Sequence, residues 1–248
     1  MTRRPLKSAL LVLLIILLAL TSMGGLILAR EDVGNGPPAF AKIIFVHYGR
    51  PAGKGGNTPT DQVTDYKYTG VRWPDDAPNI SFTVDPANRL GIPAAAVQGA
   101  IDSAAAAWHA ADAKVTFTDA GLAALTVDPR AAPDSKNTVS FRSISAQYPN
   151  AIAVTYGWYY VNTKRLFEVD TIFNDDLAWS VNAYGASFSG SYDVQNIATH
   201  EIGHWLVLGD LYKTRDAELT MYGYGAMGET KKDTLGVGDI LGINNVYP

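Results

Sequence analysis

The sequence contains no cysteine and only four histidines among its 248 residues. Without cysteine the chain forms no disulfide, and a zinc site built from thiolate ligands is excluded. A latency device in which a cysteine thiolate caps a catalytic zinc is excluded for the same reason. The histidines are therefore the first residues to consider in a search for a metal site.

The sequence also lacks a basic region of any size. After the first seven residues there is no large block of lysine and arginine, and the formal net charge is −4. These features argue against nucleic acid as a partner. With 47% hydrophobic and 18% charged residues, the composition is that of a globular protein. The length suits one domain with a sizeable core plus a tail.

A targeting segment is predicted for residues 1–30. Arg3, Arg4 and Lys7 precede residues 9–29, which contain no charged residue. An apolar core of about 7–15 residues suits a cleaved signal peptide, whereas about 20 suit a spanning helix. Both fit, and we favour an uncleaved anchor because no small-x-small cleavage site stands out. The remainder is predicted to be extracytoplasmic, either secreted or held on the outer face of the membrane by residues 9–29.

Residues 31–77 are interpreted as a linker and an N-terminal extension, with a pro-segment left open. Residues 31–39 are rich in Gly, Pro and polar residues, as linkers are. Residues 42–48 are predicted to form a strand and residues 66–73 a short one, separated by a Gly- and Pro-rich loop. His47 lies in the first of these strands, where a partly buried structural histidine is favoured over a metal ligand.

Residues 78–248 are predicted to form an α+β domain. Alternating apolar residues and β-branched or aromatic runs predict strands at residues 80–84, 115–118, 139–142, 152–161 and 166–173, the last two as a hairpin. A long Ala-rich helix is predicted to run from Gly91 to about Ala111, with His109 near its end. Further helices are predicted over residues 192–208 and 237–247.

The strongest signal is His-Glu-x-x-His at residues 200–204. On a helix His200 and His204 share one face, so both rings can point at one ion. Glu201 lies about 100° around the helix axis, beside that ion. Two imidazole ligands and a neighbouring carboxylate are what a zinc hydrolase requires. Because these three groups are costly to bury unpaired, a metal is favoured over a hydrogen-bonded structural cluster.

A catalytic zinc usually takes a third protein ligand. His47 and His109 lie far upstream, whereas Asp210 follows His200 closely in the sequence. If the helix continued, Asp210 would lie about 15 Å along the axis from His200, too far to share an ion. The chain must therefore leave the helix before Asp210, and Gly209 can supply the backbone freedom.

Several pieces of residues 78–248 resemble the metzincin metallopeptidases, most closely their matrixin-like prokaryotic branch. Residues 200–210 are similar to the extended zinc motif of members with Asp as third ligand, such as snapalysin. Residues 219–223 (Leu-Thr-Met-Tyr-Gly) resemble the Met-turn, whose Met lies under the zinc site. Residues 239–243 resemble the C-terminal helix of matrixins.

The resemblance implies a zinc-dependent endopeptidase domain that acts on extracellular protein or peptide substrates. The implied metal ligands are His200, His204 and Asp210, with Met221 in the Met-turn. Glu201 would be the general base that takes a proton from a metal-activated water. The implied fold has a twisted mixed sheet, a long backing helix, an active-site helix and a C-terminal helix.

The resemblance also implies how a substrate binds. An extended peptide would add as a strand to the sheet edge, and residues 152–160 are expected near that edge. Tyr222 or Tyr224 is a candidate for oxyanion support, although a wall or surface position is favoured for both. The family usually has Gly where this chain has Val207, so the chain is expected to leave its helix later, at Gly209.

Three alternatives stay open at this point. Glu229 has the spacing of a downstream third ligand found in another group of zinc hydrolases. A non-catalytic surface or adhesion protein could keep the same fold, although the intact Glu201 favours an enzyme. Calcium is possible at the acidic loop of residues 174–176, where a solvated turn is the favoured interpretation.

Overall fold

The computed structural model describes residues 38–248, apart from residues 51–59, 77, 112–113 and 182–183. The predicted signal peptide or anchor of residues 1–30 lies outside the described residues. Within the part of the chain that the structure describes, no helix is both long enough and apolar enough to cross a membrane.

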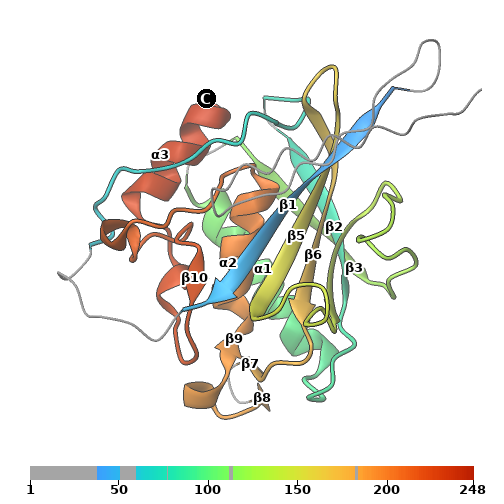
Figure 1. Cartoon of the computed structure of the whole chain (residues 1–248), viewed down its shortest axis with the longest axis vertical. Helices are drawn as coiled ribbons and strands as arrows, with labels where there is room; N and C mark the ends of the chain where they lie inside the picture. The colour runs from blue at the N-terminus through green and yellow to red at the C-terminus, as the bar shows by residue number, and fades with distance from the viewer. Residues whose placement is uncertain (1–37, 51–59, 77, 112–113, 182–183) are drawn as a thin grey trace, which may run out of the picture.

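A mixed sheet forms the centre of the fold, with seven strands among the described residues (Figure 1). In their order across the sheet the strands are β10 (Tyr224–Gly225), β1 (Phe40–Gly49), β5 (Ala151–Tyr160), β6 (Arg165–Asn174), β4 (Asn137–Arg142), β2 (Asn79–Asp85) and β3 (Thr116–Leu122). A smaller sheet has the order β8 (Tyr184–Gly185), β7 (Trp179–Val181) and β9 (Tyr192–Asp193).

The α-helices of the described chain are α1 (Ala94–His109), α2 (Val194–Trp205) and α3 (Val237–Val246). Short 3-10 helices are η1 (Phe188–Gly190), η2 (Thr214–Asp216) and η3 (Lys231–Asp233). The predicted α+β fold, with its mixed sheet, long helix, active-site helix and C-terminal helix, is confirmed. The predicted hairpin is also confirmed, because β5 and β6 pair antiparallel from Ala153↔Phe173 to Tyr160↔Arg165.

The strand β1 lies beside β5, on the side where the sequence predicts an open edge of the sheet. It pairs antiparallel with β5 over most of its length, from Phe40↔Tyr160 to Tyr48↔Ala151. β5 therefore lies between β1 and β6, and the expectation that residues 152–160 lie near the edge of the sheet is wrong. Pairing between strands so far apart in the sequence leaves no local pattern, which is why alternation alone could not reveal it.

Residues 66–73 do not form the predicted short strand. Tyr68 makes an isolated bridge to Leu208, and Arg72 makes one to Arg165. The Thr69 N–H donates to the Val207 carbonyl over 3.2 Å. This segment therefore serves as a strap over the end of α2 instead of extending a sheet.

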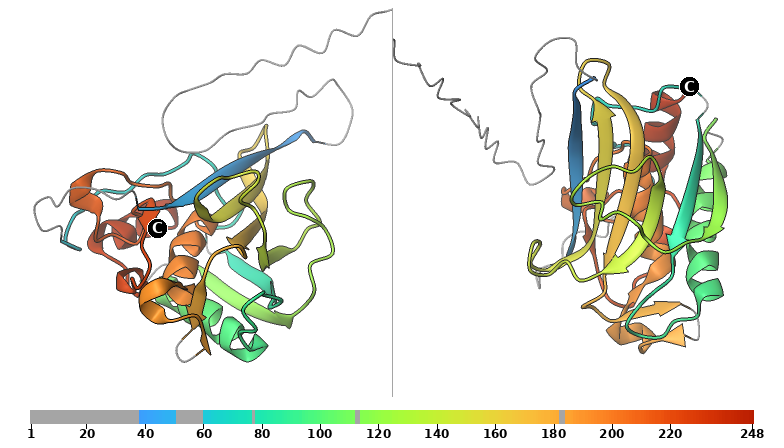
Figure 2. Two further views of the ribbon diagram at one scale, coloured as in Figure 1. Left: turned by 60° about the horizontal axis from the view of Figure 1, so that its bottom comes forward. Right: turned by 90° about the vertical axis from the view of Figure 1, so that its right-hand side faces the viewer.

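The helices α1 and α2 pack together on one face of the large sheet (Figure 2). Three of the buried side chains of α1 are alanines, and the whole set recurs at helical spacing, namely Val97, Ala100, Ile101, Ala104, Ala105 and Trp108. Small side chains let α2 approach closely, and the indole N–H of Trp108 donates to the Thr199 carbonyl over 2.7 Å. α1 therefore holds α2 in place from behind.

The ends of α2 are set by a cap and by an unusual turn. Asp193 accepts the N–H of Asn196 over 2.9 Å, which satisfies one of the free donors of the first turn. The helix ends at Trp205, and Val207 adopts a left-handed conformation with φ 63°. The prediction that the helix runs to residue 208 and turns at Gly209 is therefore wrong.

Val207 tolerates this conformation because the turn buries it. A left-handed backbone costs a non-glycine residue about 1–2 kcal/mol. Val207 is almost completely buried, and full burial of such a side chain contributes about 1.5–3 kcal/mol. Its N–H also donates to the His204 carbonyl over 2.9 Å. Burial therefore replaces the conformational freedom of glycine at the exit from α2.

Gly203 in α2 lies where a methyl group has no room. A Cβ there would lie 2.2 Å from Met221 Sδ and 2.7 Å from a ring carbon of Trp108. Gly203→Ala is expected to lower the free energy of unfolding by about 1–3 kcal/mol, the usual cost of overpacking a core. Urea denaturation followed by tryptophan fluorescence measures this change.

The matched control is Gly99→Ala in α1, where a Cβ meets nothing within 4 Å. Alanine is the better helix former by about 1 kcal/mol, so this variant should be as stable as the wild type or more stable. Equal losses at Gly203 and Gly99 would contradict the packing argument.

Candidate active site

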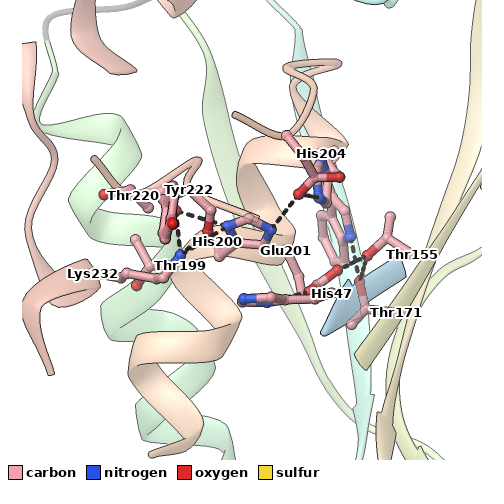
Figure 3. A network of polar contacts seen from close by, with 12 residues as sticks. His47, Thr155, Thr171, Thr199, His200, Glu201, His204, Thr220, Tyr222 and Lys232 are labelled. Atoms are coloured by element: carbon pink, nitrogen blue, oxygen red, sulfur yellow. Dashed lines mark hydrogen bonds and ion pairs between the residues drawn. The ribbon is translucent and has the colours of Figure 1, made fainter. Parts of the chain in front are cut away.

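The helix α2 carries His200, Glu201 and His204, and all three side chains are buried. The rings of His200 and His204 lie on one face of the helix with their centroids 4.7 Å apart (Figure 3). This is the arrangement that four-residue spacing on a helix predicts. The two rings and the carboxylate therefore meet in the space between α2 and the sheet.

The turn after α2 brings Asp210 back to the two histidines. Asp210 Oδ1 lies 3.2 Å from Nε2 of His200 and 3.5 Å from Nε2 of His204. The next residue anchors this geometry, because the Leu211 N–H donates to the Met221 carbonyl over 2.9 Å. The structure thus brings together all three residues that the sequence names as metal ligands.

The outer ring nitrogens of the histidines assign their tautomers. His200 Nδ1 lies 2.7 Å from the Thr220 carbonyl, and His204 Nδ1 lies 2.8 Å from the Leu208 carbonyl. A carbonyl only accepts, so each Nδ1 carries the proton and each Nε2 presents a lone pair. These lone pairs and Asp210 Oδ1 have no hydrogen-bond partner among the described residues. Such a convergence of buried acceptors needs a cation, and two imidazoles with a carboxylate suit zinc.

The electrostatics of the protein alone favour the unprotonated form of His200 and Asp210, which metal binding requires, but not that of His204. Burial lowers the pKa of His200 to about 3. Burial opposes ionisation of Asp210, but the adjacent His204 and His200 outweigh it and hold the pKa of Asp210 well below its usual value. Burial also opposes charge on His204, but Asp210 and Glu201 raise its pKa above the usual value. A metal in this site therefore competes with a proton on His204.

Glu201 is held by a chain of hydrogen bonds from the sheet. The Thr155 hydroxyl on β5 donates to Glu201 Oε2 over 2.7 Å. The Thr171 and Thr155 hydroxyl oxygens are 2.6 Å apart, and the Trp205 indole N–H donates to Thr171 over 2.9 Å. Burial raises the pKa of Glu201 to about 7. A carboxyl group with a pKa near neutrality can both accept and return a proton.

His47 lies inside this site, although the sequence favours a partly buried structural role. It is fully buried on β1, and its ring centroid is 3.8 Å from that of His200 (Figure 3). Its Nδ1 lies 3.2 Å from Glu201 Oε1. Two residues earlier, Phe45 stacks on His204 with a centroid distance of 4.1 Å. His47 is therefore completely buried where partial burial was expected, and it contacts the central carboxylate of the site.

Asp239 positions the loop that carries Met221. Met221 is buried and packs against α2 at Gly203. Asp239, in the first turn of α3, accepts the Met221 N–H over 3.0 Å and the Thr220 N–H over 2.8 Å. The same carboxylate accepts the Gly236 N–H over 2.9 Å. One buried side chain therefore satisfies three backbone donors and sets the course of the loop beneath the histidines.

Lys232 supports the same loop from another direction. It is fully buried, and its Nζ donates to the carbonyls of Thr220, over 3.1 Å, and Tyr222. The Thr220 carbonyl is also the partner of His200 Nδ1, so Lys232 and His200 share one acceptor. Burial lowers the pKa of Lys232 to about 8. Lys232 is therefore part of the shell that orients His200.

The remaining candidates lie around the three converging ligands. Tyr224 in β10 has its ring edge-on to Tyr212, with centroids 5.3 Å apart. The Arg50 guanidinium lies 5.9 Å from the centroid of Tyr222. Glu229 accepts from Arg50 over 3.4 Å, and its carboxylate is not among the ligand atoms that gather within the described residues. The geometry therefore favours Asp210 over Glu229 as a third ligand.

The acidic loop predicted as a possible calcium site is occupied by protein donors. Asp175 accepts the Arg89 N–H over 2.9 Å. Asp176 accepts from the Arg89 guanidinium over 2.9 Å and from the Ser143 hydroxyl over 2.6 Å. Calcium binding at this loop stays a prediction.

Sequence patterns alone did not identify Thr155, Lys232, Asp239 or the site contact of His47. Thr155 and Lys232 reach the site from 46 and 32 residues away, so no local spacing marks them. Asp239 did carry a signal, since an acidic residue in the first turn of a predicted helix often accepts backbone N–H groups there.

A comparison with protein families finds one that matches most of this chain. The family model described as Matrixin matches residues 72–248. The matched range contains α2, Asp210 and Met221, whereas β1 lies outside it. No curated protein matches the chain.

Asp239→Asn is expected to lower the free energy of unfolding by about 1–3 kcal/mol. The amide keeps one acceptor oxygen and leaves a buried N–H donor of the loop unpaired. Thermal and urea unfolding of the variant measure the loss.

Asp233→Asn, in the adjacent η3, is the matched control. Asp233 Oδ1 has no hydrogen-bond partner within the described chain, and burial with the Asp193 charge raises the pKa of Asp233 to about 6. A carboxyl group whose pKa is raised on folding makes the folded protein less stable as the pH rises from about 4 through 6. Removing its charge should therefore leave stability unchanged or higher at pH 7, and a loss as large as that of Asp239→Asn would argue against the assigned role.

Proposed function

The chain belongs to the matrixin family, and from this premise we propose that it is a zinc-dependent endopeptidase that cleaves extracellular proteins or peptides. The observation that carries the proposal is the convergence of two Nε2 lone pairs and Asp210 Oδ1 in one buried site without a donor. His200, His204 and Asp210 would hold the zinc. Zinc bound there would supply a Lewis acid that polarises the scissile carbonyl and activates water.

Glu201 is proposed as the general base. Its pKa of about 7, raised by burial, suits a group that accepts the proton of the attacking water and returns it to the leaving amine. The C–O bond forms first, by addition of the water oxygen to the carbonyl carbon, and the C–N bond breaks after the proton has passed to the amine nitrogen. Thr155 fixes the orientation of the carboxylate through Oε2. Oxyanion support from Tyr222 or Tyr224 stays a prediction.

The N-terminal sequence supports a proposal for the cellular setting. The basic residues and the uncharged run of residues 9–29 support export of the chain. We therefore propose that the enzyme works outside the cytoplasm, either secreted or attached to the membrane by this segment. Its partners would be protein or peptide substrates.

Asp210→Ala is expected to abolish stoichiometric zinc binding, whereas Glu229→Ala should retain it. The first variant removes a converging ligand, and the second removes a carboxylate paired with Arg50 at the surface of the site. Metal analysis of the purified chains after dialysis, with unfolding curves to check folding, distinguishes the two. Zinc loss in Glu229→Ala alone would overturn the assignment of Asp210.

Glu201→Gln is expected to retain zinc and to lose about 10²- to 10⁴-fold in the rate of cleavage of an unstructured protein, because the amide cannot accept a proton. A zinc chelator should abolish the remaining wild-type rate. Because His47 contacts Glu201, the assay is run both on the full chain and on His47→Ser, each with and without Glu201→Gln. Zinc binding without chelator-sensitive cleavage in any form would favour a non-catalytic binding protein with this fold.

A further inference from the structure

The candidate site is closed in the full chain. None of His200, Glu201, His204 and Asp210 exposes more than 4% of its surface. A hydrolase has to admit the peptide bond that it cleaves, so some element must cover the site in this state. The strand β1 brings Phe45 against His204 and His47 against Glu201.

β1 lies between β5 and β10 in the large sheet. On one side it pairs antiparallel with β5, and on the other its last residues pair parallel with β10, at Tyr48↔Tyr224 and Gly49↔Gly225. β10 pairs with β1 and with no other strand of the described chain. Figure 1 shows β1 in blue crossing in front of α2, between β5 and β10. An extended peptide that added to β5 would need this same position.

The inward side chains of β1 occupy the reacting centre. His47 Nδ1 lies within hydrogen-bond distance of Glu201 Oε1, and the Thr155 hydroxyl donates to Oε2. Both oxygens of the proposed base are therefore engaged by the protein. Phe45 covers the ring of His204 in a stacked arrangement with an interplanar angle of 9°.

Contacts at both ends keep β1 in place. At its start the Val161 N–H donates to the Ala39 carbonyl over 2.9 Å. At its end the Arg50 N–H donates to the Gly225 carbonyl over 2.8 Å, and the Arg50 guanidinium lies 3.4 Å from Glu229. The strand is thus anchored on both sides of the segment that carries Phe45 and His47.

We propose that β1 is an internal ligand of the peptide-binding cleft and keeps the full chain latent, with His47 engaging Glu201. The proposal rests on the proposed function, because it assigns the occupant of the same site. The strand comes from outside the residues that match the family.

A reversible lock tests the proposal on the full chain. Val46 and Val154 are direct partners in β1 and β5, on the face opposite His47, and belong to a small apolar cluster away from the site. Because the chain has no other cysteine, Val46→Cys with Val154→Cys can form only one intramolecular disulfide. Oxidation holds β1 in the cleft, and a phosphine reductant releases it.

A variant in which β1 binds the site more weakly, called the opened variant, is compared with the wild type. Phe45→Ser with His47→Ser removes both ring contacts of β1 with the site and leaves the zinc ligands and Glu201 intact. Loss of these contacts is expected to weaken the internal strand at least about tenfold. The lock is built into the wild type and into this variant, with zinc content and unfolding temperature measured for each.

Two readouts are recorded for each form. The first is binding of a fluorescent synthetic peptide with the sequence of residues 38–50, followed by anisotropy, which does not depend on catalysis. The second is cleavage of an unstructured protein. We expect the opened variant to exceed the wild type at least about tenfold in both readouts, and the oxidised lock to abolish both until it is reduced.

The outcomes separate the two proposals. Peptide binding or cleavage that is equal in the oxidised and reduced locks would overturn the latency of β1, whether or not the opened variant folds. Chelator-sensitive cleavage in that case would leave the proposed function standing. Lock-dependent peptide binding with zinc present but no cleavage in any form would support β1 as the occupant and overturn the peptidase.

Discussion

The structure depends on the gathering of three buried acceptors at one point. His200 Nε2, His204 Nε2 and Asp210 Oδ1 face one another, and buried groups of this kind are costly unless a positive charge pairs them. Each is oriented by something further out, the imidazoles by main-chain carbonyls and Asp210 by the turn after α2. The backing helix α1, the Met221 loop and the last helix all contribute by holding these outer partners still. Residues throughout the domain therefore help to hold the three ligands in place.

Local spacing was enough to predict the centre of the site. His200, Glu201 and His204 could be assigned from the sequence because helical periodicity places them within one turn. The hairpin of β5 and β6 and the helices could be predicted for the same reason, since their patterns are periodic over short windows. Asp210 needed one further step, the argument that the chain has to leave the helix before it.

What could not be predicted depends on long-range register or on burial. Nothing in residues 40–49 indicates that they pair with β5 and deliver His47 to Glu201, because register between distant strands has no local signature. The exit of α2 at Val207 was missed because glycine is the usual marker of a left-handed turn. Here a buried valine adopts that conformation, and only the packed structure shows the compensation.

The packing of Met221 has a consequence for oxidative chemistry. With cysteine absent, methionine provides the only sulfur in the chain, and one of these sulfurs lies directly against the helix of the candidate ligands. The space around it is so filled that even a methyl group on Gly203 would overlap it. A sulfoxide oxygen adds both volume and polarity to such a contact. Oxidation of Met221 would thus force apart the layers beneath the histidines without modifying a histidine.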